Sequence, residues 1–391
     1  MRHGIRSALV VSLTLLLCGC ASQPRQVPAS TLPWQDQHFD LASHAVTLDA
    51  GTLFQLDPQL LRQLQDGEVA KANVGRRNTH LLELVFGSDM QPFAYVGGHS
   101  TVAADTWSAR RGDCLSLSIM TLALARALEL KAHVQEVRVP PTFDRRGSME
   151  FLNAHVNVLL SNDRPLRAMR GWLPAGDFVV DFEPQPGTRQ RGAALDDSAV
   201  LARFLNNRAA EHMAAGRDGP AYAHFKAAIQ ADPGFTAAYN NLAQLYLRHG
   251  LARDAETLLR SALARDDESD LALAALHGLL VSQERLAEAQ AYEQQLHARR
   301  ERDPYYWLGL GIDHLRHGRD RQAVRALEQA QRLSNGFEEV HRHLAVAYWR
   351  TGQAHKARDQ LAVLLALGQG ESAIAQLHEK FKSNYNTPAL Q

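Results

Sequence analysis

The stretch TAAYNNLAQLYLRHGLARDAETLLRSA, residues 236–262, sets a pattern that the chain repeats every 34 residues. One position of the pattern is always alanine, at Ala221, Ala255, Ala289, Ala323 and Ala357. A second position is mostly small, at Ala209, Ala243, His277, Gly311 and Ala345, and a third is mostly glycine, at Gly216, Gly250, Glu284, Gly318 and Gly352. A fixed period of this length indicates stacked helix pairs that bury a continuous core. We therefore predict an all-α solenoid of about five repeats over residues 201–391.

The period, the small residues at helix crossings and the turn glycine resemble the tetratricopeptide repeat over roughly residues 202–367. Pro233 stands where that family places its repeat-ending proline. The third repeat differs most, because His277 replaces a small residue, Glu284 replaces the turn glycine and Pro304 is displaced by three residues. We expect a local distortion there and no break in the stack. The resemblance implies a concave face that binds a protein or peptide partner.

Composition narrows the classes of function. The chain has 391 residues, 45% of them hydrophobic and 21% charged, which is typical of folded globular protein in two or three domains. The chain has 42 basic residues (lysine and arginine) and 42 acidic residues (aspartate and glutamate). It therefore has no excess of positive charge that would attract nucleic acid. We expect neither a nucleic-acid partner nor a cofactor. We expect no metal site either, since the pairs His314/His317 and His341/His343 lack carboxylate or cysteine neighbours at ligand spacing. The oligomeric state stays open.

The first residues have the pattern of an export signal. Arg2 and Arg6 precede an apolar run, Leu9–Leu17, that is too short to span a bilayer. The run ends in Leu17-Cys18-Gly19-Cys20, which resembles the lipobox of bacterial lipoproteins. The resemblance implies removal of residues 1–19 and lipidation of Cys20. The alternative is an ordinary secretory signal with a chance cysteine.

A lipidated Cys20 has two further implications. Residues 20–50 begin with proline, serine and glutamine and have no periodic apolar pattern, so we interpret them as a tether. The residue after Cys20 is Ala21 and not aspartate, which by the sorting rule of enteric bacteria favours the outer membrane, with the protein facing the periplasm.

Cys114 then remains as the single thiol in an oxidising compartment, where structural cysteines normally occur in pairs. It is either a buried, inert core residue or a nucleophile. We expect Asp113 to cap the apolar helix that begins at Cys114. A helix N-terminus lowers the pKa of a thiol and supplies N–H groups for an oxyanion.

The surrounding chain, residues 51–200, is predicted to mix helices and strands. The apolar spacing predicts helices over 58–71, 79–86, 101–107 and 114–130. Alternating and β-favouring residues predict strands over 132–139, 151–160 and 177–182. In the second strand His155 falls on the polar face, as a base facing a cleft would. In the third, Asp181 is a lone carboxylate in an apolar run, where it needs a hydrogen-bonding partner.

Gly112-Asp113-Cys114 with ALARALELKA behind it, His155 in NAHVNV and Asp181 in VVDFEP resemble the transglutaminase-like branch of the papain-like superfamily, over about residues 80–185. The resemblance implies an α+β papain/transglutaminase-like domain with Cys114 as nucleophile, His155 as base and Asp181 as the group that orients the base. Trp107 would line the cleft or frame the oxyanion site, although packing is the plainer interpretation.

These residues predict an envelope-anchored thiol enzyme, a cysteine protease or amidase, that cleaves or transfers an amide or peptide acyl group. Hydrolysis is preferred to cross-linking because water is abundant. Cell-wall peptides are permitted as substrates by the same chemistry. The alternative from another class is a catalytically idle, membrane-tethered adaptor that holds an envelope protein complex together.

Overall fold

The fold is described from a computed structural model. It describes residues 32–87, 92–137, 143–146, 149–152, 155–161, 166–168, 171–173, 176–183, 192–267, 269–334 and 338–366. The predicted signal and Cys20 lie outside the described residues. Within the described ranges, no helix is long and apolar enough to cross a membrane.

The N-terminal part of the chain is built around one apolar helix, α5 (Cys114–Ala127). Nearly every residue of α5 is buried, because its sequence is apolar on all sides except for small Ser and Thr hydroxyls and the exposed Arg126. The shorter helices of this part are η2 (Leu41–Ser43), α1 (Ala50–Leu53), α2 (Pro58–Asp66), η3 (Glu68–Lys71), α3 (Val74–Phe86) and α4 (Ala103–Ala109). Helix α2 begins where Asp57 accepts hydrogen bonds from the backbone N–H groups of Gln59 and Leu60.

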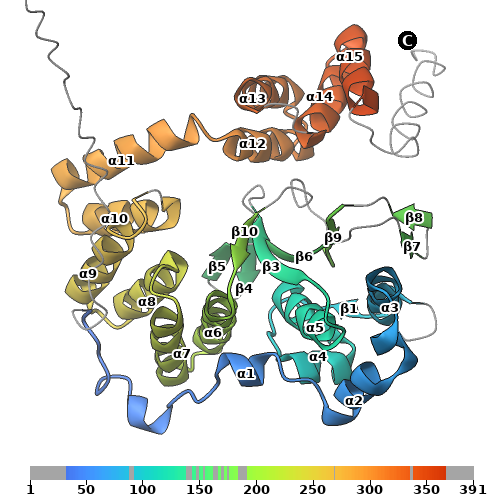
Figure 1. Ribbon diagram of the computed structural model, residues 1–391. Helices are drawn as coiled ribbons and strands as arrows, with labels where there is room; N and C mark the ends of the chain where they lie inside the picture. The colour runs from blue at the N-terminus through green and yellow to red at the C-terminus, as the bar shows by residue number, and fades with distance from the viewer. Residues whose placement is uncertain are drawn as a thin grey trace, which may run out of the picture.

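A four-stranded antiparallel sheet packs against α5 in the order β10-β3-β6-β9 (Figure 1). Its strands are β3 (Ala132–Val137), β6 (His155–Leu160), β9 (Phe178–Val180) and β10 (Ala193–Leu195). The other strands form pairs: β1 (Ala94–Tyr95) with β2 (Arg111–Gly112), β4 (Phe143–Arg146) with β5 (Met149–Leu152), and β7 (Leu166–Ala168) with β8 (Gly171–Leu173). The N-terminal part therefore combines helices with short strands.

The predicted single strand over 151–160 is wrong. Residues 151–152 belong to β5, which pairs with β4, whereas β6 begins at His155 and pairs with β3 and β9. His155 and Asn157 do share one face of β6, since both reach Asp181, but that face is buried like the rest of the strand. Its polar side chains are hydrogen-bonded to buried partners in the sheet instead of facing water.

The C-terminal part is all α-helical and forms a series of antiparallel helix pairs (Figure 1). The helices are α6 (Asp197–Ala214), α7 (Asp218–Ala231), α8 (Thr236–Arg248), α9 (Ala252–Leu263), α10 (Asp270–Ser282), α11 (Leu286–Arg300), α12 (Pro304–Arg316), α13 (Asp320–Leu333), α14 (Glu338–Arg350) and α15 (Ala354–Ala366). The recurring glycines at 216, 250, 318 and 352 lie in the turns with positive φ, which glycine adopts without strain. Glu284, in the same register, adopts a φ of 60°.

The repeat stack is interrupted between α11 and α12, which corrects the expectation of a distortion without a break. One hydrophobic core runs from Leu32 to Ala289, and a second runs from Leu308 to Leu364. Within the described chain, α9 packs on α10 and α13 packs on α14, but no comparable packing joins α11 to α12. The sequence of α11 explains this, because only Ala289 and Leu296 of its residues are buried and most others are charged or polar.

Residues 32–49 pack on the repeats, which corrects the interpretation of 20–50 as a tether throughout. Phe39 is 4% exposed and stacks on Tyr222 with ring centroids 4.7 Å apart. The Tyr246 hydroxyl donates to the Pro33 carbonyl at 2.8 Å, and Lys226 pairs with Asp36 at 2.7 Å. The sequence hides this segment because its apolar residues are too widely spaced to show a period.

Candidate active site

Cys114 is the first residue of α5, and the loop before it is held by Asp113. The Asp113 carboxylate accepts hydrogen bonds from the backbone N–H of Ser116 at 2.7 Å and from the Ser116 hydroxyl at 2.6 Å. It also accepts one from the Ser100 hydroxyl at 2.5 Å. Gly112 has no room for a side chain, since a Cβ there would lie 2.9 Å from Ser116 Cβ. The predicted N-cap is confirmed, and it fixes the backbone of Cys114.

The environment of the thiol differs from the expected one. The Cys114 residue is partly exposed to solvent, and it packs against the main hydrophobic core. Burial raises the pKa of the Cys114 thiol to about 12, and the negative charge of Asp113 acts in the same direction. A hydrogen bond from the backbone N–H of Val156 lowers this pKa in part. The lowered pKa predicted from the helix N-terminus is therefore not found, because desolvation outweighs that effect.

His155 and Asp181 form a buried pair. His155 Nε2 lies 2.8 Å from Asp181 Oδ2, and the two side chains are 2% and 8% exposed. Burial by itself raises the pKa of Asp181. The hydrogen bond and charge of His155 and the hydrogen bond from Asn157 lower this pKa by more than burial raises it, so the net shift is downward. Because Asp181 occupies Nε2, Nδ1 is the nitrogen left to exchange a proton with another group.

Val156 places this pair beside the thiol. His155 and Val156 are adjacent on β6, and the Val156 N–H lies near enough to the Cys114 thiol to lower its pKa. Helix α5 packs directly on β6. The structure thus brings Cys114, His155 and Asp181 to one end of the α5–sheet interface.

Two buried amides support Asp181, and sequence reasoning missed their role. Asn157 donates to Asp181 Oδ2 at 3.1 Å and accepts from the Gln135 amide at 2.9 Å. The Gln135 oxygen accepts from the backbone N–H of Gly192 at 3.1 Å. Gln135 and Asn157 are both 0% exposed. Their position in the sequence could have indicated this role, because amide side chains inside β-favouring runs require hydrogen-bonding partners when they are buried.

Tyr95 and Glu183 also flank the thiol and were not predicted. Tyr95 pairs with Gly112 across β1 and β2, and the Val96 N–H donates to the Gly112 carbonyl at 2.9 Å. Burial and a hydrogen bond to Glu183 raise the pKa of the Tyr95 phenol. The Glu183 N–H in turn donates to Asp181 at 3.0 Å. The Tyr95 phenol therefore lies near the turn after β9, beside the loop before Cys114.

Trp107 lies on α4 against Phe93 and Arg110. The Phe93 and Trp107 ring centroids are 5.9 Å apart. The Arg110 guanidinium lies 3.6 Å from the Phe93 ring and 4.9 Å from the Trp107 ring. These contacts give Trp107 a packing role, and its place in a cleft or an oxyanion site stays a prediction.

The first helix of the repeats supports the same loop. Glu211 on α6 accepts a hydrogen bond from the Ser100 N–H at 2.7 Å, and Asn207 donates to the Ser100 hydroxyl at 3.2 Å. Because Ser100 holds Asp113, the repeats contribute to the position of Cys114. In the part of the chain that the structure describes, no three His, Cys, Asp or Glu side chains are grouped as a metal site would require.

A sequence model of the tetratricopeptide repeat matches residues 212–280 and 314–381. These segments are tetratricopeptide repeats. The unmatched residues between them, 281–313, include α11 and most of α12, where the core divides. No curated protein matches the chain in sequence.

Several solved structures are similar in part. A crystal structure of MamA is 21% identical and covers 40% of this chain and 92% of its own, with a TM-score of 0.23. A structure from the functional characterisation of Pseudomonas aeruginosa pilF is 18% identical, covering 49% and 86%, with a TM-score of 0.27. A structure of YrrB, described as a TPR protein with an unusual peptide-binding site, is 20% identical, covering 46% and 92%, with a TM-score of 0.24.

Proposed function

We propose that the chain is a thiol hydrolase of amide or peptide bonds, with Cys114 as nucleophile, His155 as base and Asp181 as the group that orients His155. The observation that carries the proposal is the buried His155–Asp181 pair, whose histidine precedes Val156 on β6, the strand that packs on α5 and brings the Val156 N–H near the Cys114 thiol. A nucleophile, a base and an orienting group in this arrangement support acyl transfer. The tetratricopeptide repeats indicate a role in protein–protein interaction.

The raised pKa of Cys114 favours a mechanism in which the thiol is protonated at rest. His155 Nδ1 takes the thiol proton as the sulfur attacks the substrate carbonyl carbon, which gives a tetrahedral oxyanion. The oxyanion collapses, the C–N bond breaks, and His155 delivers its proton to the departing amine. A thioester on Cys114 remains.

Water completes the cycle. His155 takes a proton from a water molecule as its oxygen attacks the thioester carbonyl. The C–S bond breaks, the carboxylic acid leaves, and the proton returns to the sulfur. An amine in place of water would give transfer and cross-linking. Asp181 stays ionised throughout and stabilises the imidazolium, since its pKa is lowered in the pair.

We further propose that lipidation at Cys20 anchors this enzyme to the envelope, facing the periplasm, with the outer membrane favoured by Ala21. The repeats would then recruit the protein partner or substrate.

A second function, an idle membrane-tethered adaptor, is favoured by one observation. Burial raises the pKa of Cys114, as it does for an inert core thiol. Acylation by p-nitrophenyl acetate separates the two functions. For the full-length protein at pH 7 the enzyme predicts an acetyl group on Cys114, located by peptide mapping, and a rate at least about 100-fold lower in His155→Ala. Absence of this adduct from the folded protein would favour the adaptor.

A further inference from the structure

The fourth repeat leaves core positions open. In α8, α10 and α14 the residues in register with Leu310 are Leu242, Leu276 and Leu344, all 0% exposed. Leu310 itself is only partly buried. The same holds for His314, whose equivalents Tyr246, Leu280 and Tyr348 are at most 4% exposed.

The reason is the missing neighbour. Helices α8, α10 and α14 each pack on the repeat before them, whereas α12 lacks such packing on α10 or α11 in the described residues. The face of α12 and α13 that a preceding helix pair would cover is therefore open. It forms a cavity of about 790 Å³.

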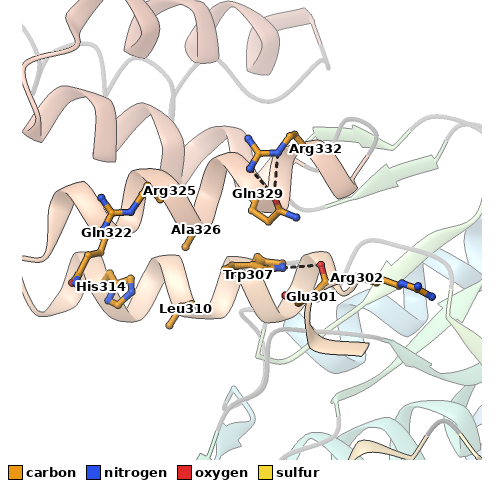
Figure 2. A pocket seen from close by; sticks show the side chains of 10 residues that line it. All are labelled: Glu301, Arg302, Trp307, Leu310, His314, Gln322, Arg325, Ala326, Gln329 and Arg332. Atoms are coloured by element: carbon orange, nitrogen blue, oxygen red, sulfur yellow. Dashed lines mark hydrogen bonds between the residues drawn. The ribbon is translucent and has the colours of Figure 1, made fainter. Parts of the chain in front are cut away.

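Figure 2 shows the side chains around this cavity, which we name the repeat-four cavity. Trp307, Leu310 and Ala326 give it an apolar floor. The Trp307 indole is fixed by its N–H, which donates to the Glu301 carbonyl at 3.1 Å.

The rim of the repeat-four cavity is basic. Arg302, Arg325 and Arg332 line it, and Glu301 is the single acidic residue among the lining side chains. Arg332 donates to Gln329 at 3.0 Å. Among the described residues Arg302 and Arg325 have no carboxylate partner, so two guanidinium groups remain available to an incoming anion.

We propose that the repeat-four cavity binds an acidic amphipathic helix of a partner protein. The equivalent faces of α8, α10 and α14 are covered by the preceding helix pair, so the shape of the open α12 face suits a helix. The apolar floor would take large apolar side chains, and the arginines would pair with carboxylates beside them. This proposal does not depend on catalysis, and it places the partner on the side of a repeat instead of on the concave face.

A randomised peptide library displayed on phage, selected on the full-length protein, tests the proposal. We expect enriched peptides to combine net negative charge with apolar residues at helical spacing. Synthetic copies of them, measured by fluorescence anisotropy, should bind at least about tenfold more weakly to Arg325→Glu, because attraction becomes repulsion. Leu310→Glu should weaken binding as well, and added salt should do so for every acidic peptide.

Arg253→Glu, an exposed arginine on α9, is the matched control and should bind as the original protein does. Cys114→Ala should also leave binding unchanged, which separates this site from the catalytic proposal. Basic or uncharged enriched peptides, equal affinity for Arg325→Glu, or no enrichment would each overturn the proposal. Self-association that Leu310→Glu abolishes would overturn it as well, since the cavity would then hold a second copy of the chain.

Discussion

At the residue scale, Asn157 holds the candidate site together through two buried hydrogen bonds. Its amide donates to Asp181 and accepts from Gln135. Replacing it with leucine removes both bonds, so Asp181 loses one of its donors and the buried Gln135 amide loses this acceptor. We expect Asn157→Leu to lower the free energy of unfolding by about 1–3 kcal/mol in urea denaturation, because each unsatisfied buried group keeps its desolvation cost.

The control for this change is Gln294→Leu on α11, where the side chain is exposed and the free energy of unfolding should change by less than about 0.5 kcal/mol. Equal stability of the two variants would show that the Gln135–Asn157–Asp181 bonds do not stabilise the fold.

The three residues of the proposed triad were predicted from the sequence, but their surroundings could not be. A lone thiol at a helix start, a strand histidine and an isolated strand carboxylate each have a local signature. The partners that surround them do not, because Gln135, Tyr95 and Glu183 reach the site only through strand pairing and turns. The upward shift of the Cys114 pKa was not predicted for the same reason, because burial depends on tertiary packing.

At the scale of elements, the N-terminal segment depends on Phe39. This ring stacks against both Tyr222 and Tyr246, with centroids 4.7 Å and 5.9 Å away. We expect Phe39→Ala to weaken docking of residues 36–44 by about 3–5 kcal/mol and to raise their hydrogen-exchange rates, since a buried aromatic ring is lost.

Phe86→Ala is the comparison, because Phe86 is 45% exposed and lies outside the segment. Exchange in residues 36–44 that is the same in both variants would mean that Phe39 does not hold the segment on the repeats.

The turn at Glu284 is the second element-scale case. Its φ of 60° lies in the left-handed region, where a side chain costs about 1–2 kcal/mol. Glu284→Gly should therefore raise the free energy of unfolding by about 1 kcal/mol, measured from urea denaturation midpoints, after allowing for the greater freedom of unfolded glycine.

The reciprocal change is Gly318→Ala, at a φ of 68° in the same register, and it should destabilise by a similar amount. A lower stability of Glu284→Gly would contradict the interpretation of residue 284 as a strained turn.

At the scale of the whole molecule, the 34-residue period predicted the helix pairs but not their interruption. The period depends on each residue's place within a repeat, whereas the break depends on whether α11 presents an apolar face to α12. Its polar sequence could have given that warning. The packing of residues 32–49 on the repeats could not be predicted, because it joins segments about 190 residues apart, as Asp36 and Lys226 show.

The whole-molecule claim is that one chain joins a working thiol site to protein-binding repeats, and it rests on an active Cys114. The most direct measurement is alkylation of Cys114 in the full-length protein by iodoacetamide at a series of pH values, followed by peptide mapping. Because burial raises the pKa to about 12, the rate should keep rising with pH beyond pH 8 without a plateau. At pH 7 the rate should be about 10–100-fold lower in His155→Ala, because the base that accepts the thiol proton is lost. Equal rates in the two proteins, or reaction only after unfolding in urea, would contradict the account and identify Cys114 as a structural core residue.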